Sequence, residues 1–360
     1  MIALAKVALA AAAAAVCWAY QATRPPPAAI LGAPGGPPIT SPRVQLKDGR
    51  HLAYREAGVD RKTAKYKIIF FHGFASTKEN SFPVSAGLVE ELGIHLLFFD
   101  RAGYGDSDAN PKRGLRSDAT DVEELADALQ LGDKFYVVGC SMGGYVAWSC
   151  LHYIPHRLAG AALVVPAVNY WWPAPADVST SAYGRLDARD RLAFWIAHHF
   201  PSLFYAWMTQ KLFAMSPIVR GERDAFTDKD WEILTETRRR ERASGQVDPA
   251  KATQQGTYDS LCRDVTILFG TWDFDPTETK NPLPDGEGVV SMWQGREDKI
   301  VRVEIQRYVA QKLPWVRYHE HPEAGHTLPD MDGVGDEIIR ELLLGGEKQH
   351  GSPSALRRDG

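Results

Sequence analysis

The chain has 360 residues, a formal net charge of −4 and a hydrophobic content of 44%, and a chain of this length can bury a core without disulfide bonds. Its slight acidity argues against a nucleic-acid partner, because binding to a phosphate backbone needs a basic surface. The four cysteines show neither the spacing of zinc ligands nor that of a disulfide framework, so we expect reduced thiols.

Residues 1–23 form an apolar segment in which Lys6 is the one charged residue. The run from 7 to 20 is short for a membrane-spanning helix, which needs roughly 17–25 residues, and it resembles the core of a signal peptide. Counted from Ile2, with Lys6 reaching toward the headgroups, the segment is long enough to span. We expect a transmembrane anchor at the ER or another endomembrane. The alternative is a cleaved targeting peptide on a secreted or organellar protein.

Proline and glycine concentrate in residues 24–43, a composition that predicts an extended, semi-rigid linker. Residues 345–360 are polar and rich in glycine, so we expect a flexible tail there. The folded domain should therefore span residues 44–344.

Short apolar runs recur through this domain, most of them ending at a glycine or a charged residue: 67–71, 95–99, 135–138, 161–165, 289–293 and 315–319. Residues 44–55 predict a strand pair around a Lys-Asp-Gly turn, and 265–269 is a further possible strand. Helical patterns separate the runs, at 84–92, 117–131, 144–153 and 304–312. This alternation predicts a mostly parallel, doubly wound α/β sheet, with its site at the C-terminal ends of the strands.

The stretch from about 169 to 264 breaks this rhythm and includes a charged, helix-like run at 231–242. We interpret it as a helical cap insertion over the sheet. It is rich in aromatic residues: Tyr170, Trp171, Trp172, Tyr183, Phe194, Trp195, Phe200, Phe204, Tyr205, Trp207 and Phe213. They favour an apolar acyl or alkyl group on the substrate, although they could instead form the insertion's own core.

A G-x-S-x-G pentapeptide, residues 139–143, follows an apolar strand and precedes a helical stretch, as a nucleophile elbow requires. Small residues two positions before and after Ser141 let the backbones pass closely, so that its hydroxyl stands clear of the sheet. We predict Ser141 as the nucleophile. The Met142 amide, at a helix start, should face a developing oxyanion. The neighbouring Cys140 is interpreted as a packed thiol rather than as the nucleophile.

A second oxyanion donor is expected from the loop after an earlier strand, where the sequence reads Phe71-His72-Gly73-Phe74. Gly73 permits a turn that aims the next amide inward, so Phe74 N–H is the candidate. We expect His72 to brace this loop rather than to act as the catalytic base.

The general base should lie in a loop after the last strand, where Gly325 precedes His326. Asp298 follows the preceding strand and is the candidate acid that orients this histidine. Other carboxylates could take that role: Glu297, Asp273 or Asp275. With Asp298 the chain order is Ser, Asp, His, which is the order of α/β-hydrolases.

Together these motifs resemble the α/β-hydrolase superfamily over about residues 44–344. The stretch DRAGYGDS, residues 100–107, is similar to that family's D-x-x-G-x-G-x-S loop. More narrowly, FGTWDFDP and WQGREDKIV…KLPWVRYHE resemble a plant group of membrane-anchored, poorly characterised hydrolases. The resemblance implies the fold and the triad, whereas the substrate varies across the superfamily.

The favoured hypothesis is therefore an esterase or lipase-like serine hydrolase that cleaves a small, apolar carboxylic ester through an acyl-enzyme on Ser141. No metal or organic cofactor is expected. The alternatives are a ligand receptor of the same fold with slow turnover, an acyltransferase and a thioesterase.

Overall fold

An eight-stranded sheet forms the centre of the protein in the computed structural model, which describes residues 2–284 and 286–345. The strands are β1 Arg43–Gln45, β2 His51–Gly58, β3 Tyr66–Phe71, β4 Ile94–Phe99, β5 Phe135–Cys140, β6 Leu158–Val164, β7 Val290–Gly295 and β8 Val316–His321. Their order across the sheet is β1-β2-β4-β3-β5-β6-β7-β8. β2 runs antiparallel to both β1 and β4, whereas all other neighbours are parallel. The predicted fold class is confirmed.

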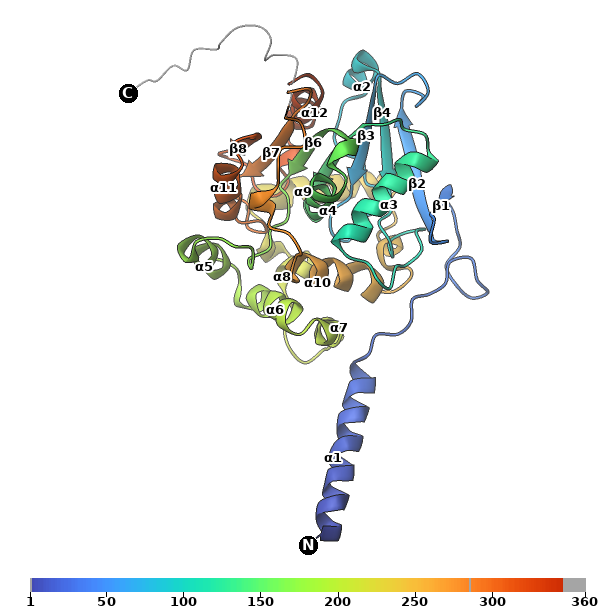
Figure 1. Ribbon diagram of the computed structural model, residues 1–360, viewed down its shortest axis with the longest axis vertical. Helices are drawn as coiled ribbons and strands as arrows, with labels where there is room; N and C mark the ends of the chain where they lie inside the picture. The colour runs from blue at the N-terminus through green and yellow to red at the C-terminus, as the bar shows by residue number, and fades with distance from the viewer. Residues whose placement is uncertain (1, 285, 346–360) are drawn as a thin grey trace.

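Helices cover both faces of the sheet (Figure 1). One face carries α3 Leu115–Ala128, α4 Gly143–Tyr153 and α11 Val303–Lys312, and the other carries α2 Ala86–Leu92 and α12 Val334–Leu344. In β3, Ile68 and Phe70 join the core under α2 and α12, whereas Ile69 and Phe71 join the opposite one. Because both faces are buried, the strand reads as an unbroken apolar run instead of an alternating one.

The cap lies between β6 and β7, at the end of the sheet where the parallel strands finish (Figure 1). Its α-helices are α5 Ala176–Gly184, α6 Ala188–His199, α7 Pro201–Thr209, α8 Pro217–Arg220, α9 Asp228–Ser244 and α10 Arg263–Phe269. The possible strand at 265–269 is therefore wrong, since those residues lie in α10. Val265, Leu268 and Phe269 are its buried apolar residues, a spacing of three and four that matches a helix face.

The first helix, α1 Ile2–Thr23, projects away from the folded body (Figure 1). The prediction of a transmembrane anchor is wrong: in residues 2–284 and 286–345, no helix combines the length and the apolar character that crossing a membrane requires. Alanine supplies much of α1, and its small side chain carries little apolar surface. The expected membrane partner rested on anchoring by this segment, which the structure does not support. Apart from Gly345, the predicted tail at 345–360 lies outside the described residues.

Candidate active site

Ser141 lies on a tight turn between β5 and α4. Its φ of +52° falls in the left-handed region, which a residue with a side chain rarely adopts. The neighbouring glycines make the turn possible. A Cβ on Gly139 would lie 2.5 Å from the carbonyl oxygen of Gly143, and one on Gly143 would lie 2.1 Å from that of Phe71. The backbones of β3, β5 and α4 therefore pack in direct contact beneath the serine.

Replacing Gly143 by alanine should destabilise the fold, because the new methyl group would overlap the Phe71 carbonyl and push α4 off the sheet. We expect a loss of about 3 kcal/mol in the free energy of unfolding, the upper end for overpacking, measured by chemical denaturation. Gly87→Ala in α2 is the matched control, since an added Cβ there meets nothing within 4 Å. It should be neutral or stabilising by up to about 1 kcal/mol. Equal losses in both variants would contradict the argument.

Three side chains from three strand ends form a hydrogen-bonded series. The Oγ atom of Ser141 lies 2.8 Å from Nε2 of His326, and Nδ1 of His326 lies 2.8 Å from Oδ2 of Asp298. Asp298 follows β7 and His326 follows β8. The other oxygen of Asp298 accepts the backbone N–H groups of Ile300 and Val301 at 2.8 and 2.9 Å, which fixes the carboxylate. The arrangement can move a proton from the serine to the histidine and stabilise the resulting cation.

The other candidate acids lie elsewhere. Glu297 is exposed and contributes its backbone N–H to the carbonyl of Ala324. Asp273 accepts the hydroxyl of Tyr153, and Asp275 accepts the amide of Thr277 at the start of a short turn. Among the described residues, none of these carboxylates forms a hydrogen bond or an ion pair with His326.

Two further residues near Ser141, His72 and Cys140, are also unsuited to a direct role in catalysis. His72 contacts Gly73 and Arg101 instead of Ser141: its Nδ1 lies 2.9 Å from the carbonyl oxygen of Gly73, and its Nε2 accepts the amide of Arg101 at 3.2 Å. Burial raises the pKa of the Cys140 thiol to about 12. Since the thiolate is the reactive form, Cys140 is a poor nucleophile at neutral pH.

The two predicted oxyanion amides lie on either side of the serine. Met142 directly precedes the first residue of α4. Phe74 follows Gly73, where an added Cβ would lie 3.5 Å from the Cβ of Ser141. In the described chain, neither amide is recorded as a hydrogen-bond donor. Both N–H groups are therefore free to receive an oxyanion beside the serine.

A model of the α/β hydrolase fold matches residues 66–330. The chain belongs to this family. Solved structures agree on this fold. The enol-lactonase from Burkholderia xenovorans LB400 superposes with a TM-score of 0.55 and 16% identity, over 83% of this chain and 98% of that one. A thermophilic esterase from Thermogutta terrifontis gives 0.53 and 19%, over 83% and 97%.

Curated relatives of the hydrolase match over shorter stretches. Lipase 3 of Moraxella sp. (strain TA144) is 31% identical over 130 residues, which cover 36% of this chain and 39% of the lipase. The sn-1-specific diacylglycerol lipase ABHD11 of Danio rerio is 31% identical over 88 residues, which cover 24% and 27%. The chain thus spans less than half the length of these relatives. These partial matches agree with the family assignment.

A cavity of about 630 Å³ opens above the triad of the hydrolase. Ser141 and His326 line it, together with Phe74 and Met142. Of the cap aromatics, Tyr170, Phe194, Phe226 and Phe269 line its wall, whereas Trp195 and Phe213 are exposed on the surface. A cavity of this size is in the range of small-molecule sites. Within the described residues, no cluster of three His, Cys, Asp or Glu side chains is placed to hold a metal ion.

Asp230, in the first turn of α9, supports the loop that carries His326, and the sequence analysis did not identify it. It is 1% exposed, and its Oδ1 accepts the backbone N–H and the hydroxyl of Thr327 at 2.9 and 2.8 Å. Gly325 packs against it so closely that an added Cβ would lie 2.0 Å from the carboxylate. The sequence pattern around Asp230 marks a helix start, and nothing in it signals this distant contact.

Carboxylates around His326 favour its protonated form. Burial by itself would lower the pKa of the imidazole, but the charges of Asp298, Asp230 and Asp330 outweigh burial and hold the pKa above its ordinary value. Burial, followed by repulsion from Glu241, raises the pKa of Asp330 to about 6. Since a general base must be neutral to accept a proton, activity should rise with pH as His326 loses its proton.

Replacing Asp230 by asparagine should move the acidic limb of the kcat/KM profile to lower pH. The change removes a negative charge that stabilises the imidazolium, so the pKa of His326 falls and the neutral base persists in more acidic solution. Asparagine keeps an oxygen that can accept from Thr327. Asp228→Asn is the control, because Asp228 is an exposed acid on the same helix that pairs with Arg223. An unmoved limb in Asp230→Asn, or equal movement in both variants, would refute this assignment.

Proposed function

We propose that this α/β hydrolase cleaves carboxylic esters through an acyl-enzyme on Ser141. The observation that carries the proposal is the pair of 2.8 Å contacts linking Ser141, His326 and Asp298. They supply a nucleophile, a base and an orienting acid, so the reaction needs neither a metal nor an organic cofactor.

In the first half of the reaction, the Oγ atom of Ser141 attacks the ester carbonyl while Nε2 of His326 takes its proton. The amides of Phe74 and Met142 stabilise the negative charge that develops on the carbonyl oxygen. His326 then returns the proton to the departing alcohol, which leaves an acyl group on Ser141. In the second half, His326 removes a proton from water, and the resulting attack releases the acid and restores the serine.

We propose a small ester with an apolar acyl or alkyl group as the substrate. The cavity at Ser141 takes phenylalanines from β3 and from the cap, Phe70 and Phe194, into its walls. The names of the partial relatives, a lipase and a diacylglycerol lipase, point in the same direction. The narrower likeness to a plant group of membrane-anchored hydrolases, carried by residues 269–276, 293–301 and 312–320, stays a prediction.

A fluorophosphonate probe tests the proposal directly. It should label the folded protein, and mass spectrometry should place the adduct on the peptide that contains Ser141, because only an activated serine reacts with such probes at a useful rate. p-Nitrophenyl esters should be turned over continuously, with kcat/KM rising from acetate toward medium-length acyl chains as the apolar walls become filled.

Absence of labelling in folded protein would refute the proposal, as would an adduct on another residue. One burst of nitrophenol without continuing turnover would indicate a receptor of the same fold. If an added alcohol accelerates the release of nitrophenol and the acyl group is found on that alcohol, the protein would be an acyltransferase. A preference for thioesters of the same acyl group would indicate a thioesterase.

A further inference from the structure

The oxyanion amide of Phe74 belongs to the same peptide unit as the carbonyl of Gly73. In a trans peptide these two groups point in opposite directions within one plane. Whatever holds the Gly73 carbonyl therefore also fixes the direction of the Phe74 N–H. Without such a hold, rotation of this one peptide would turn the N–H away from Ser141 and remove one of the two donors.

Two donors hold the Gly73 carbonyl. The Nδ1 atom of His72 lies 2.9 Å from this oxygen, and Nη2 of Arg101 donates to it at 3.2 Å. Burial, followed by the nearby charge of Arg101, lowers the pKa of His72 well below its ordinary value, so the ring is neutral and has one donor and one acceptor nitrogen. Since Nε2 accepts the amide of Arg101, the proton is on Nδ1 and points at Gly73.

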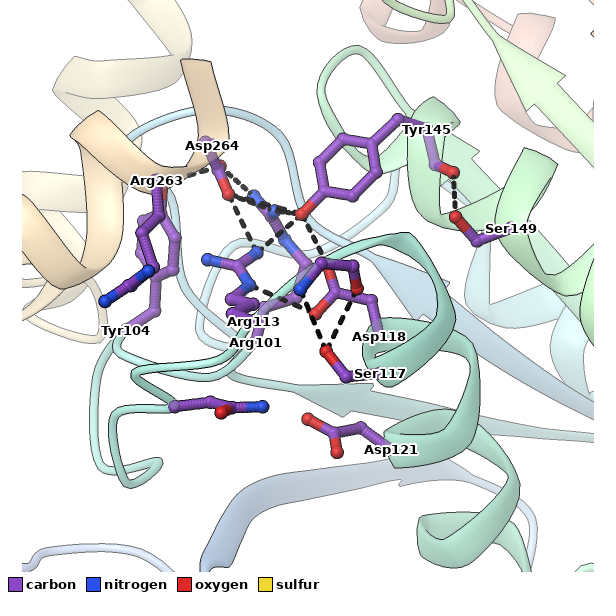
Figure 2. Close-up of polar contacts among 12 residues, drawn as sticks. Arg101, Tyr104, Arg113, Ser117, Asp118, Asp121, Tyr145, Ser149, Arg263 and Asp264 are labelled. Carbon is purple, nitrogen blue, oxygen red and sulfur yellow. Dashed lines mark hydrogen bonds and ion pairs between the residues drawn. The ribbon is translucent and has the colours of Figure 1, made fainter. Parts of the chain in front are cut away.

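The cap determines where the Arg101 guanidinium lies. Asp264, in the first turn of α10, accepts from Nη1 and Nη2 of Arg101, both at 2.6 Å. Its carboxylate is completely buried and also accepts from Tyr104 at 2.7 Å and from Arg113 at 2.8 Å. Figure 2 shows these side chains converging on Asp264. A bidentate pair of this kind fixes both the position and the plane of the guanidinium.

The same guanidinium also contacts the elbow helix. Nη1 of Arg101 donates to the hydroxyl of Tyr145 at 3.0 Å, and Tyr145 lies in the first turn of α4, three residues after Met142. That hydroxyl donates in turn to Asp118 of α3 at 2.6 Å, as Figure 2 also shows. The Arg101 side chain thus joins the loop that carries Phe74, the helix that begins directly after Met142, and the cap.

We propose that Asp264 is a positioning residue of the oxyanion hole: through Arg101 it holds the Gly73–Phe74 peptide in the orientation that aims the Phe74 N–H at the reacting carbonyl. The proposal rests on the function proposed above and adds that the cap helps to assemble the catalytic site. Asp264 touches no reacting atom. Its effect is on the alignment of a donor whose complete removal in other enzymes costs about 10²–10³-fold in kcat.

Asp264→Asn tests this proposal. Asparagine is uncharged and offers the Arg101 guanidinium a single acceptor oxygen in place of a bidentate carboxylate. Arg101 should therefore shift, so that kcat falls by about tenfold or more. Affinity for a trifluoromethyl ketone inhibitor, whose adduct carries an oxyanion, should fall in parallel, whereas affinity for the matching methyl ketone should not. Asp121→Asn is the matched control: Asp121 is buried and pairs with Arg50 at 2.6 Å, but it does not contact Arg101 or Gly73. It should lower the melting temperature while kcat and the affinity for the inhibitor are kept.

His72 offers a second test in case Asp264→Asn does not fold. An asparagine amide can take the place of Nδ1 and still donate to the Gly73 carbonyl, whereas a glutamine amide reaches the place of Nε2 and leaves that carbonyl with one donor fewer. His72→Asn should therefore keep kcat within about threefold, and His72→Gln should lower it by about tenfold, with the same loss of affinity for the trifluoromethyl ketone.

Crystal structures of Asp264→Asn and His72→Gln test the orientation of the Gly73–Phe74 peptide without any measurement of turnover. The Gly73 carbonyl should be rotated in both variants. An unchanged peptide in both variants would overturn the proposal, even if the wild type hydrolyses no ester. Equal losses of kcat in Asp264→Asn and Asp121→Asn would also overturn it, because they would indicate a general effect on stability. If instead the wild-type protein is not labelled at Ser141, the proposed function fails while the peptide orientation remains measurable.

Discussion

Replacing Ser141 by alanine should lower kcat for a p-nitrophenyl ester by about 10⁶-fold, the cost of removing the nucleophile from a working triad. Nothing else near the elbow can substitute for the hydroxyl: the thiol of Cys140 is kept protonated by burial, which raises its pKa to about 12. Steady-state hydrolysis at high enzyme concentration measures the residual rate. Circular dichroism shows whether the variant is folded, as it should be, because Ser141 donates its backbone amide to Val164, which alanine preserves.

Cys140→Ala is the control for this experiment. It removes the neighbouring side chain and leaves the Ser141–His326 contact in place, so kcat should stay within several-fold of the wild type. The opposite pattern, with loss of activity in Cys140→Ala and retention in Ser141→Ala, would make the thiol the nucleophile. Comparable large losses in both variants would mean that the elbow itself is disturbed, and the assignment of Ser141 would then lack support.

Local sequence signals predicted both the sheet and the candidate triad, because each residue of the triad follows a strand of the sheet. A strand buried on both faces is an unbroken apolar run, and parallel strands end at one edge of the sheet. Ser141, Asp298 and His326 each follow such a run, so the topology by itself brings them to the same edge. Asp298 also differs from Glu297 in side-chain direction, which the sequence could not give. The structure places the first against His326 and the second in solvent.

Residues of the cap could not be assigned roles in the same way. Asp230 and Asp264 lie in charged, helical stretches, and such residues ordinarily face water. Their buried positions arise because the cap folds back over distant segments, where Asp264 meets Arg101 and Asp230 meets Thr327. No periodicity within the cap encodes those partners. For the same reason residues 265–269 could be read as a strand from the sequence, whereas in the structure Val265, Leu268 and Phe269 form the buried face of a helix.

The second large effect is expected at Asp298. Replacing it by asparagine should lower kcat by about 10⁴-fold while the fold is retained. The Oδ1 position can still accept the amides of Ile300 and Val301, but the side-chain amide would face Nδ1 of His326 as a donor. The imidazole would then take the tautomer with its proton on Nε2, where it meets the Ser141 hydroxyl and can no longer accept a proton from it. Pre-steady-state measurement of the acylation rate isolates this step.

Two matched control variants test whether Asp298 acts by orienting His326 or only by placing a negative charge near it. Glu297→Gln changes the adjacent exposed carboxylate, and Asp273→Asn changes the one that accepts from Tyr153. Both should leave kcat within about threefold, because neither side chain contacts His326 in the part of the chain that the structure describes. If Asp273→Asn instead caused the large loss, the acid would follow α10 rather than β7, and the geometry of the triad would have to be different. A pronounced loss in Glu297→Gln would show that charge near His326 matters more than the hydrogen bond to Nδ1.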